Sequence, residues 1–248
     1  MELTVLGSSG TYPAPGRPAS GYLVRSAGTT IWCDAGPGTF SEMAALVEPA
    51  SLDAVILSHL HPDHCTDLFA LAHYLAFGPP MGSVCIDVLA PPASADRFFG
   101  FLDAGVGHAV RDVLRFVEAV PGLAPTFGAL GVTFAAATHS IPALVTRFAS
   151  GGGDLVYSGD TGPFPNFEVF ASGAGLLLCE ASLGVDDPPY VHHMTARQAG
   201  RVAAAAGVGR LVLTHLRPTL DADRAIAGAA SVYDGEVLVA EPGMRIDI

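Results

Sequence analysis

The chain has 248 residues, of which 50% are hydrophobic and 15% are charged, so its composition is globular and excludes a disordered chain. Its formal net charge is −12 and its 12 basic residues are all arginine, so it lacks the general positive field that attracts nucleic acid. No apolar stretch reaches the ~18 residues that a membrane span needs, and no secretory signal pattern precedes the first strand pattern.

Short strand patterns dominate the first part of the chain, separated by Gly and Pro turns. Strands are predicted at 2–7, 21–26, 29–36, 53–58 and 83–91, and helices at 40–47, 65–77 and 94–105. The cysteines form no CxxC pair, and we expect reduced thiols, buried where Cys85 and Cys179 fall in strand patterns.

The second part of the chain has the same pattern of short strands separated by turns and helices. Strands are predicted at 113–119, 132–139, 144–150, 153–160, 175–181, 210–215 and 236–248. Helices are predicted at 194–207, with Thr195 as N-cap and Gly207 as its stop, and at 221–230. Strand runs followed by helices, twice over, indicate a single domain over 1–248 that is built from two similar layers.

The stretch "LSHLHPDH" gathers three histidines and one aspartate directly after the apolar run "DAVIL". His59 and His61 are two positions apart at the end of a strand, so their side chains point to the same side and can reach one ion. Asp63 and His64 follow a proline turn at the start of a helix, where they can face a second ion. Imidazole and carboxylate ligands suit zinc, and also manganese or iron.

Three later strand patterns also end on metal-type ligands. "TFAAATH" ends at His139, "LVYSGD" at Asp160 and "RLVLTH" at His215. Four such strand ends favour a metal site over a turn of solvated histidines. Two ions ~3.5–4 Å apart can share a water and lower its pKa towards ~7. A phosphodiester suits such a site, because negative charge grows on its oxygens during attack.

This ordered set resembles the metallo-β-lactamase superfamily of dinuclear hydrolases, and the resemblance covers almost the whole chain, including "DAGPG" at 34–38. It implies an α/β fold, a four-layer αββα sandwich, with two divalent metal ions at one edge of the sheets. It also implies that Asp63 holds the attacking hydroxide in line and that Asp34 orients the ligands. The implied ligands are His59, His61 and His139 for one ion, Asp63, His64 and His215 for the other, and Asp160 between them.

Two further motifs resemble the ribonuclease Z-like phosphodiesterase branch of that superfamily. "EAS" at 180–182 is similar to its Glu-Ala-Thr motif, and "HMTARQA" at 193–199 to its His-x-Thr motif. The branch histidine protonates the leaving oxygen or steadies the phosphate. The resemblance implies this role for His193, with Glu180 as its orienting partner and the adjacent His192 as an alternative. His73, in a helix, and His108, expected in a loop, are interpreted as structural or surface residues.

The tRNA-gripping arm of ribonuclease Z is inserted between the equivalents of His139 and Asp160. Here only residues 140–159 lie between them, which one hairpin with "SGGGD" as its turn would fill. The acidic charge and absent lysine also disfavour tRNA and other nucleic acids. "SHLHPDHCTDLFAL" looks more like the actinobacterial relatives that degrade cyclic nucleotides. The expected function is therefore metal-dependent hydrolysis of a small phosphodiester, such as a 3′,5′-cyclic nucleotide.

Other functions stay open at this point. They are tRNA 3′-end processing, hydrolysis of lactones, thioesters or sulfate esters, and non-catalytic nucleotide binding, against which the intact ligand set argues. We expect a cytoplasmic protein with no membrane partner. A homodimer is possible through the apolar stretch "FALAHYLAFGPP", although a helix packed on the sheet also explains that pattern.

Overall fold

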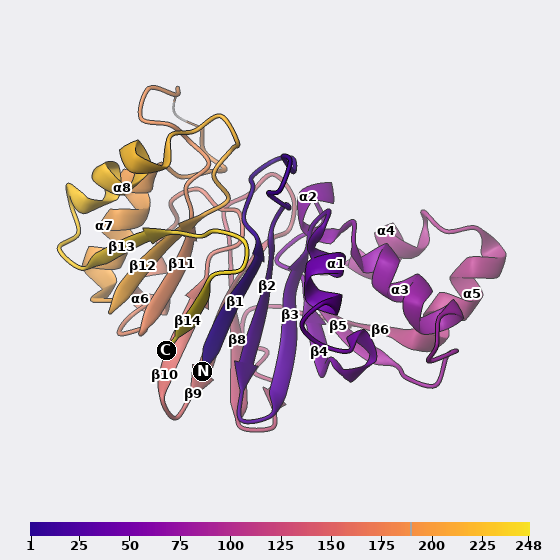
Figure 1. Cartoon of the computed structure of the whole chain (residues 1–248). Helices are drawn as coiled ribbons and strands as arrows, with labels where there is room; N and C mark the ends of the chain where they lie inside the picture. Colours follow the sequence, from indigo (N-terminus) through magenta and orange to yellow (C-terminus); the bar gives the residue numbers. More distant parts are fainter. Residues whose placement is uncertain (189) are drawn as a thin grey trace.

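The computed structural model describes residues 1–188 and 190–248, and it consists of two mixed sheets packed face to face with helices on both outer faces (Figure 1). The predicted αββα sandwich is therefore confirmed. The strand order is β14-β1-β2-β3-β4-β5-β6 in the first sheet and β13-β12-β11-β10-β9-β8-β7 in the second. No helix in the described residues is both long and apolar enough to cross a membrane.

The first sheet is formed by the N-terminal part of the chain and one strand from its C-terminus. Its strands are β1 (Glu2–Gly7), β2 (Gly21–Ser26), β3 (Thr29–Ala35), β4 (Ala54–Ile56), β5 (Ile86–Ala90), β6 (Leu114–Glu118) and β14 (Arg245–Asp247). The helical segments of this half are α1 (Thr39–Ala44), η1 (Pro49–Ser51), α2 (Pro62–Cys65), α3 (Leu68–Phe77), α4 (Ser94–Phe99) and α5 (Ala104–Val113). Trp32 of the sheet and Leu71 of α3 share a buried apolar cluster, so these helices cover its outer face.

The second sheet follows in the chain and has its own helical cover. Its strands are β7 (Thr126–Phe127), β8 (Leu130–Ala136), β9 (Leu144–Ser150), β10 (Gly153–Tyr157), β11 (Leu176–Glu180), β12 (Arg210–Thr214) and β13 (Glu236–Val239). Its helices are α6 (Phe167–Phe170), α7 (Ala196–Ala206) and α8 (Ala222–Ala230). Between the sheets, Leu3 and Tyr22 of the first pack with Phe148 and Leu178 of the second. Because both faces of each sheet are covered, a central strand such as β11, "LLLCE", has four consecutive apolar residues before its terminal glutamate.

Strand direction brings the candidate ligands to one edge. β4 is parallel to β3 and β5, and β10 and β12 are both parallel to β11. β8 runs in the same direction as β10, because each is antiparallel to β9. The carboxyl ends of β8, β10 and β12 therefore lie at one edge of the second sheet. The backbone N–H of Leu144 donates to the carbonyl of Ser58 at 2.9 Å and ties the first sheet to that edge.

The predicted helix at 94–105 is wrong, because two helices occupy this region. α4 ends at Phe99, and α5 begins after Asp103, whose side chain caps it by accepting from two backbone N–H groups. His108 is an exposed residue of α5 and does not lie in a loop. The sequence signal was the cap residue Asp103, which precedes ten further helical residues.

Two other predictions are also wrong. The C-terminal stretch 236–248 forms two strands in different sheets, β13 and β14, with a turn at Gly243 (φ +86°) between them. Cys85 is exposed and precedes β5, whereas Cys179 is buried as predicted. Thr195 and Gly207 do cap α7 as predicted, with Gly207 in the left-handed conformation.

Candidate metal centre

The seven side chains predicted as metal ligands lie together where the two sheets meet. They form two groups, and within each group one donor atom per residue lies within 4.8 Å of the others. Asp160 belongs to both groups. The first group is His59, His61, His139 and Asp160, and the second is Asp63, His64, Asp160 and His215.

The local backbone explains how neighbouring ligands reach different positions. His61 is the extended N-cap of the short helix α2, and the proline after it occupies the first helical position, which suits its fixed φ. Asp63 and His64 therefore lie in the first turn of α2, and their side chains approach the cluster from a different direction than that of His59. His215 has a left-handed backbone (φ +55°), a conformation that is uncommon for residues other than glycine. Such strained backbone occurs preferentially at functional sites.

Hydrogen bonds on the outer side of the rings leave one nitrogen of each of four histidines facing the cluster. His64 Nδ1–H donates to Asp34 at 2.7 Å, and the partners of the other three Nδ1 atoms lie 3.0–3.1 Å away. Metal-binding histidines typically have such a partner on the second nitrogen. The four Nδ1 partners are Ser58 Oγ for His59, Asp34 for His64, the His192 carbonyl for His139 and Ser182 Oγ for His215.

The ring nitrogens that face inward are crowded in a way that suits a cation. His61 Nδ1 lies 3.1 Å from His59 Nε2 and 3.0 Å from His139 Nε2. His64 Nε2 and His215 Nε2 are 3.2 Å apart. Nitrogen lone pairs this close need a proton or a cation between them. The side chains present therefore fit bound divalent metal ions, since imidazole and carboxylate are suitable ligands.

The electrostatics of the centre also suit cations. Burial lowers the pKa of His59, and it lowers the pKa of His139 to about 4, so both rings are neutral as a metal ligand requires. Burial alone would raise the pKa of Asp160, but the charges of His215 and His64 outweigh it and lower that pKa well below its usual value. Asp160 Oδ1 is buried without a hydrogen-bond partner among the described residues. An ionised carboxylate oxygen in this state is suited to a cation.

A network centred on Asp34 supports the centre from beneath. Its carboxylate accepts from the Ser58 backbone N–H and hydroxyl at 2.7 Å each, from His64 Nδ1 at 2.7 Å and from the Tyr157 hydroxyl at 2.6 Å. Asp34 is fully buried and has φ +56°. The orienting position expected for Asp34 is thus observed. Ser58 and Tyr157 were not predicted as part of the site, and the only signal for them was their place near a strand end.

The loop after β1 forms another wall of the site, a role that was not predicted for it. The Thr11 backbone N–H donates to Asp63 Oδ2 at 2.8 Å. A Cβ on Gly10 would lie 2.3 Å from the carbonyl oxygen of His215, so only glycine lets this loop approach so closely. The "GSSGT" run in the sequence is the signal for such an approach.

His193 and Glu180 form a hydrogen-bonded pair beside the cluster. Glu180 ends β11 and is fully buried, and its Oε1 accepts from His193 Nδ1 at 2.8 Å. The Thr161 N–H also donates to Glu180, at 2.7 Å. Burial alone would lower the pKa of His193, but the hydrogen bond and the charge of Glu180 outweigh it and raise that pKa. The His193 ring lies nearly parallel to that of His215, with 5.8 Å between their centroids.

His192 makes different contacts from its neighbour. Its carbonyl accepts from His139 Nδ1, and its own Nδ1 is buried without a partner among the described residues. Of the two histidines, His193 is therefore the one that pairs with Glu180. His73 is exposed on α3, where its Nδ1 lies 2.8 Å from the carbonyl of Phe69, and it is not part of the cluster.

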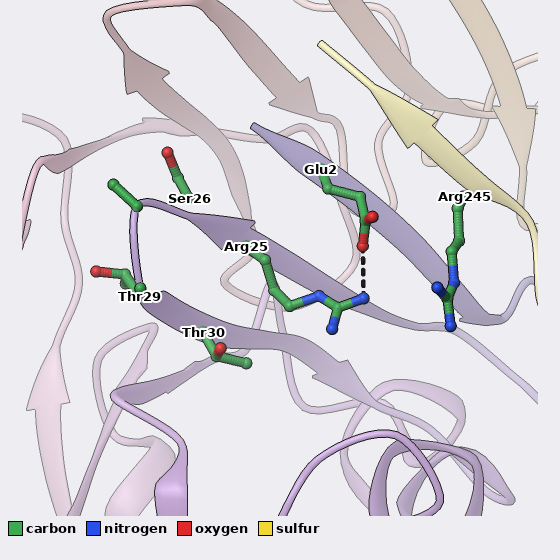
Figure 2. Close-up of a pocket in the computed structure, with 8 residues that line it drawn as sticks. Glu2, Arg25, Ser26, Thr29, Thr30 and Arg245 are labelled. Carbon is green, nitrogen blue, oxygen red and sulfur yellow. Dashed lines mark hydrogen bonds and ion pairs between the residues drawn. The ribbon is translucent and has the colours of Figure 1, made fainter.

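Two hollows elsewhere on the molecule contain none of the clustered histidines. One of about 360 Å³ lies beside Glu2 at the start of β1, the opposite end of the strand from the cluster, and there Arg25 pairs with Glu2 (Figure 2). The other, of about 650 Å³, lies between α7 and α8 and includes Leu220 and Arg224. The chemistry of the ligand cluster identifies the functional site better than the presence of a cavity does.

Known proteins share this fold and sequence pattern. A model of the beta-lactamase superfamily domain matches residues 29–216. The probable metallo-hydrolase YhfI of Bacillus subtilis is 30% identical over 98% of this chain and 98% of its own. The crystal structure of YhfI superposes with a TM-score of 0.89 over 99% of this chain and 98% of that one, with 29% identity.

Two other relatives match the chain over its whole length. An uncharacterized protein of Mycobacterium leprae, ML1173, is 34% identical over 100% of this chain and 89% of its own. Ribonuclease Z of Mycobacterium marinum is 27% identical over 100% of this chain and 99% of its own. With this family match and the His/Asp cluster that can hold divalent metal ions, the chain belongs to the beta-lactamase superfamily as a metallo-hydrolase related to YhfI and ribonuclease Z.

Proposed function

We propose that this protein is a dinuclear metal-dependent phosphodiesterase that cleaves a small phosphodiester, with a 3′,5′-cyclic nucleotide as its substrate. The observation that carries the proposal is the position of Asp160, whose carboxylate belongs to two donor groups at once, next to the His193–Glu180 pair. His59, His61 and His139 would hold one ion, and zinc fits these ligands, with manganese and iron as alternatives.

Asp63, His64 and His215 would hold the second ion, and Asp160 would bridge the two. Bound together, the ions supply an acidified water and a counter-charge for the phosphoryl oxygens. Asp63 has a further role in this proposal. Its Oδ2 accepts from the Thr11 N–H, which fixes the carboxylate where it can orient the attacking water.

His193 is proposed as the general acid, with Glu180 as the positioning residue. Glu180 binds Nδ1 of His193, so the opposite nitrogen, Nε2, is available to the substrate. The water oxygen forms a new bond to phosphorus while the ester bond to the leaving oxygen breaks. His193 gives its proton to that leaving oxygen, and the raised pKa of His193 favours the protonated ring that this step needs.

The proposed substrate is small because of the chain between His139 and Asp160. Strands β9 and β10 fill most of this segment as an antiparallel hairpin, which leaves no length for a projecting arm. The net charge of −12 further disfavours a long polyanion. A cyclic nucleotide carries one phosphodiester and a single charge, so its binding depends less on a positive surface.

One observation favours a second candidate function. The chain matches ribonuclease Z of Mycobacterium marinum over its full length, so tRNA 3′-end processing is the alternative to small-phosphodiester hydrolysis. The two candidate functions differ in whether the protein binds a folded RNA beyond the scissile phosphate. A precursor tRNA and cyclic AMP, compared under the same conditions, distinguish them.

The test uses purified protein loaded with zinc or manganese. We expect hydrolysis of cyclic AMP and of bis(p-nitrophenyl) phosphate, loss of both activities on chelation, and little cleavage of precursor tRNA. Hydrolysis of neither small substrate, with both metals measured as bound, would contradict the proposal. Efficient tRNA cleavage without cyclic AMP hydrolysis would select the alternative.

A further inference from the structure

Large apolar side chains are exposed beside the metal centre. Tyr190 is 51% exposed and Val191 is 68% exposed, both in the segment that leads into His193. Tyr12, in the loop that contacts Asp63, is 49% exposed. Exposed apolar groups gathered near a polar site commonly bind part of a ligand. We propose that Tyr190 is a stacking platform for the aromatic base of the substrate, an inference that rests on the proposed phosphodiesterase function.

A row of rings leads from the metal centre to Tyr190. The His193 ring is 5.8 Å from that of His215, at an interplanar angle of 17°. The Tyr190 ring is 5.7 Å from that of His193, at 30°. A substrate whose leaving oxygen meets His193 would place the substituent on that oxygen on the side of Tyr190. In a nucleotide that substituent is a ribose with its base, and bases stack well on tyrosine.

Described residues on either side of Tyr190 in the chain make tertiary contacts. Asp187 forms an ion pair with Arg217, which lies two residues after the candidate ligand His215. On the other side, the carbonyl of Val191 packs closely on Gly162. A Cβ added to Gly162 would lie 1.8 Å from the carbonyl oxygen of Val191. A ring beside such contacts loses less freedom when a ligand binds, which favours binding.

The Tyr190 ring contacts the rings of His193 and, edge-on at 5.3 Å, His192, and neither contact requires a hydroxyl group. About half of Tyr190 is nevertheless open to solvent. The ring face, and not the hydroxyl, is the feature the proposal uses. Stacking accepts any base, so it predicts activity on several cyclic nucleotides, with purines bound more tightly than pyrimidines.

The experiment compares Tyr190→Ala with Tyr190→Phe and with Val185→Ala. Val185 is 71% exposed in the same segment and serves as the matched control. Two cyclic phosphodiesters are used, cyclic AMP and the base-free 1-deoxyribose 3,5-cyclic phosphate. We expect Tyr190→Ala to raise KM for cyclic AMP about tenfold or more, the scale of one stacked base, with kcat and the base-free substrate little changed. Tyr190→Phe and Val185→Ala should behave like the unmodified protein.

A binding measurement separates this inference from the proposed function. The fluorescence anisotropy of the etheno derivative of cyclic AMP reports binding without turnover, and a fluorescent single-stranded RNA serves as a second probe with bases. Weaker binding of either probe to Tyr190→Ala, but not to Tyr190→Phe, supports the platform even if no phosphodiester is hydrolysed, and the probe affected shows whether the base belongs to a free nucleotide or an RNA. Unchanged binding of both probes, no binding to the unmodified protein, or an equal loss on the base-free substrate would overturn it.

Discussion

At the scale of single residues, the two adjacent histidines before α7 differ in what they contact. His193 binds the buried carboxylate of Glu180, whereas His192 offers its backbone carbonyl to His139. A side-chain truncation removes the first interaction but leaves the second in place. The pair is therefore a matched test of general acid catalysis.

His193→Ala should keep both metals and lower the rate on cyclic AMP by about 10²–10⁴, the usual scale for a general acid. On bis(p-nitrophenyl) phosphate the loss should be small, because p-nitrophenolate departs without protonation. His192→Ala should change neither rate by more than a few-fold. Steady-state kinetics with metal analysis measure these effects. An equal loss on both substrates would indicate phosphate positioning, and no loss would remove His193 from the mechanism.

Asp160 is the residue on which the two donor groups depend. Asp160→Ala should leave the fold intact, because among the described residues its Oδ1 faces only other candidate ligands such as His64 Nε2, at 3.2 Å, but it should lower metal content and abolish turnover. The physical reason is that two cations without a bridging carboxylate repel each other. Elemental analysis and circular dichroism measure the outcome, with Asp112→Ala on the exposed face of α5 as control. Full metal occupancy and normal activity would place Asp160 outside the centre.

At the scale of elements, α7 begins with a capping box directly after the Glu180–His193 pair. The Thr195 hydroxyl accepts from the Gln198 N–H at 3.3 Å, and the Gln198 side chain accepts from the Thr195 N–H at 2.8 Å. Because the start of the helix fixes the chain that precedes it, the cap also positions His193.

Thr195→Ala should lower the free energy of unfolding by about 1 kcal/mol, the usual value of an N-cap oxygen. Thr195→Ser keeps the hydroxyl oxygen and should lower the free energy of unfolding much less. Urea denaturation of the two variants and the unmodified protein measures the difference. Equal loss in both variants would mean that the threonine methyl group, and not the cap, is what stabilises this position.

At the scale of the whole molecule, the candidate metal ligands come from both sheets. His59, His61 and His64 follow β4 of the first sheet, whereas His139 and His215 follow strands of the second. A cation that binds only the folded chain stabilises it by mass action. Metal should therefore stabilise the packing of the two sheets against each other.

Removing the metals should lower the melting temperature. At a free zinc concentration of 100 times Kd, bound zinc raises the free energy of unfolding by about 2.7 kcal/mol. For a chain of this size, that corresponds to a rise in melting temperature of roughly 5–11 °C. Differential scanning calorimetry with zinc and with a chelator measures it. His108→Ala, which changes an exposed histidine of α5, should keep the full difference. The same melting temperature in both conditions would show that the centre does not hold zinc in the folded protein.

Local patterns predicted much of this molecule. The strand ends that carry His59, His139, Asp160 and His215 were predicted because apolar runs are followed directly by ligand-type residues. The caps of α7 were predicted because Thr and Gly at its ends each have a local backbone role. The break between α4 and α5 was missed, because the apolar spacing continues across it and only Asp103 marks the new start.

The sequence by itself determined most strands, most helices and the metallo-hydrolase family, and it predicted the ligand set, because these depend on short-range patterns and on the order of motifs. Only the tertiary structure decided which of the two histidines pairs with Glu180, and that Tyr157 supports Asp34 across 123 positions of the chain. It also decided that the last strand, β14, crosses to the first sheet beside β1. These contacts depend on how the two sheets pack and where the chain crosses between them, which no local pattern of residues specifies.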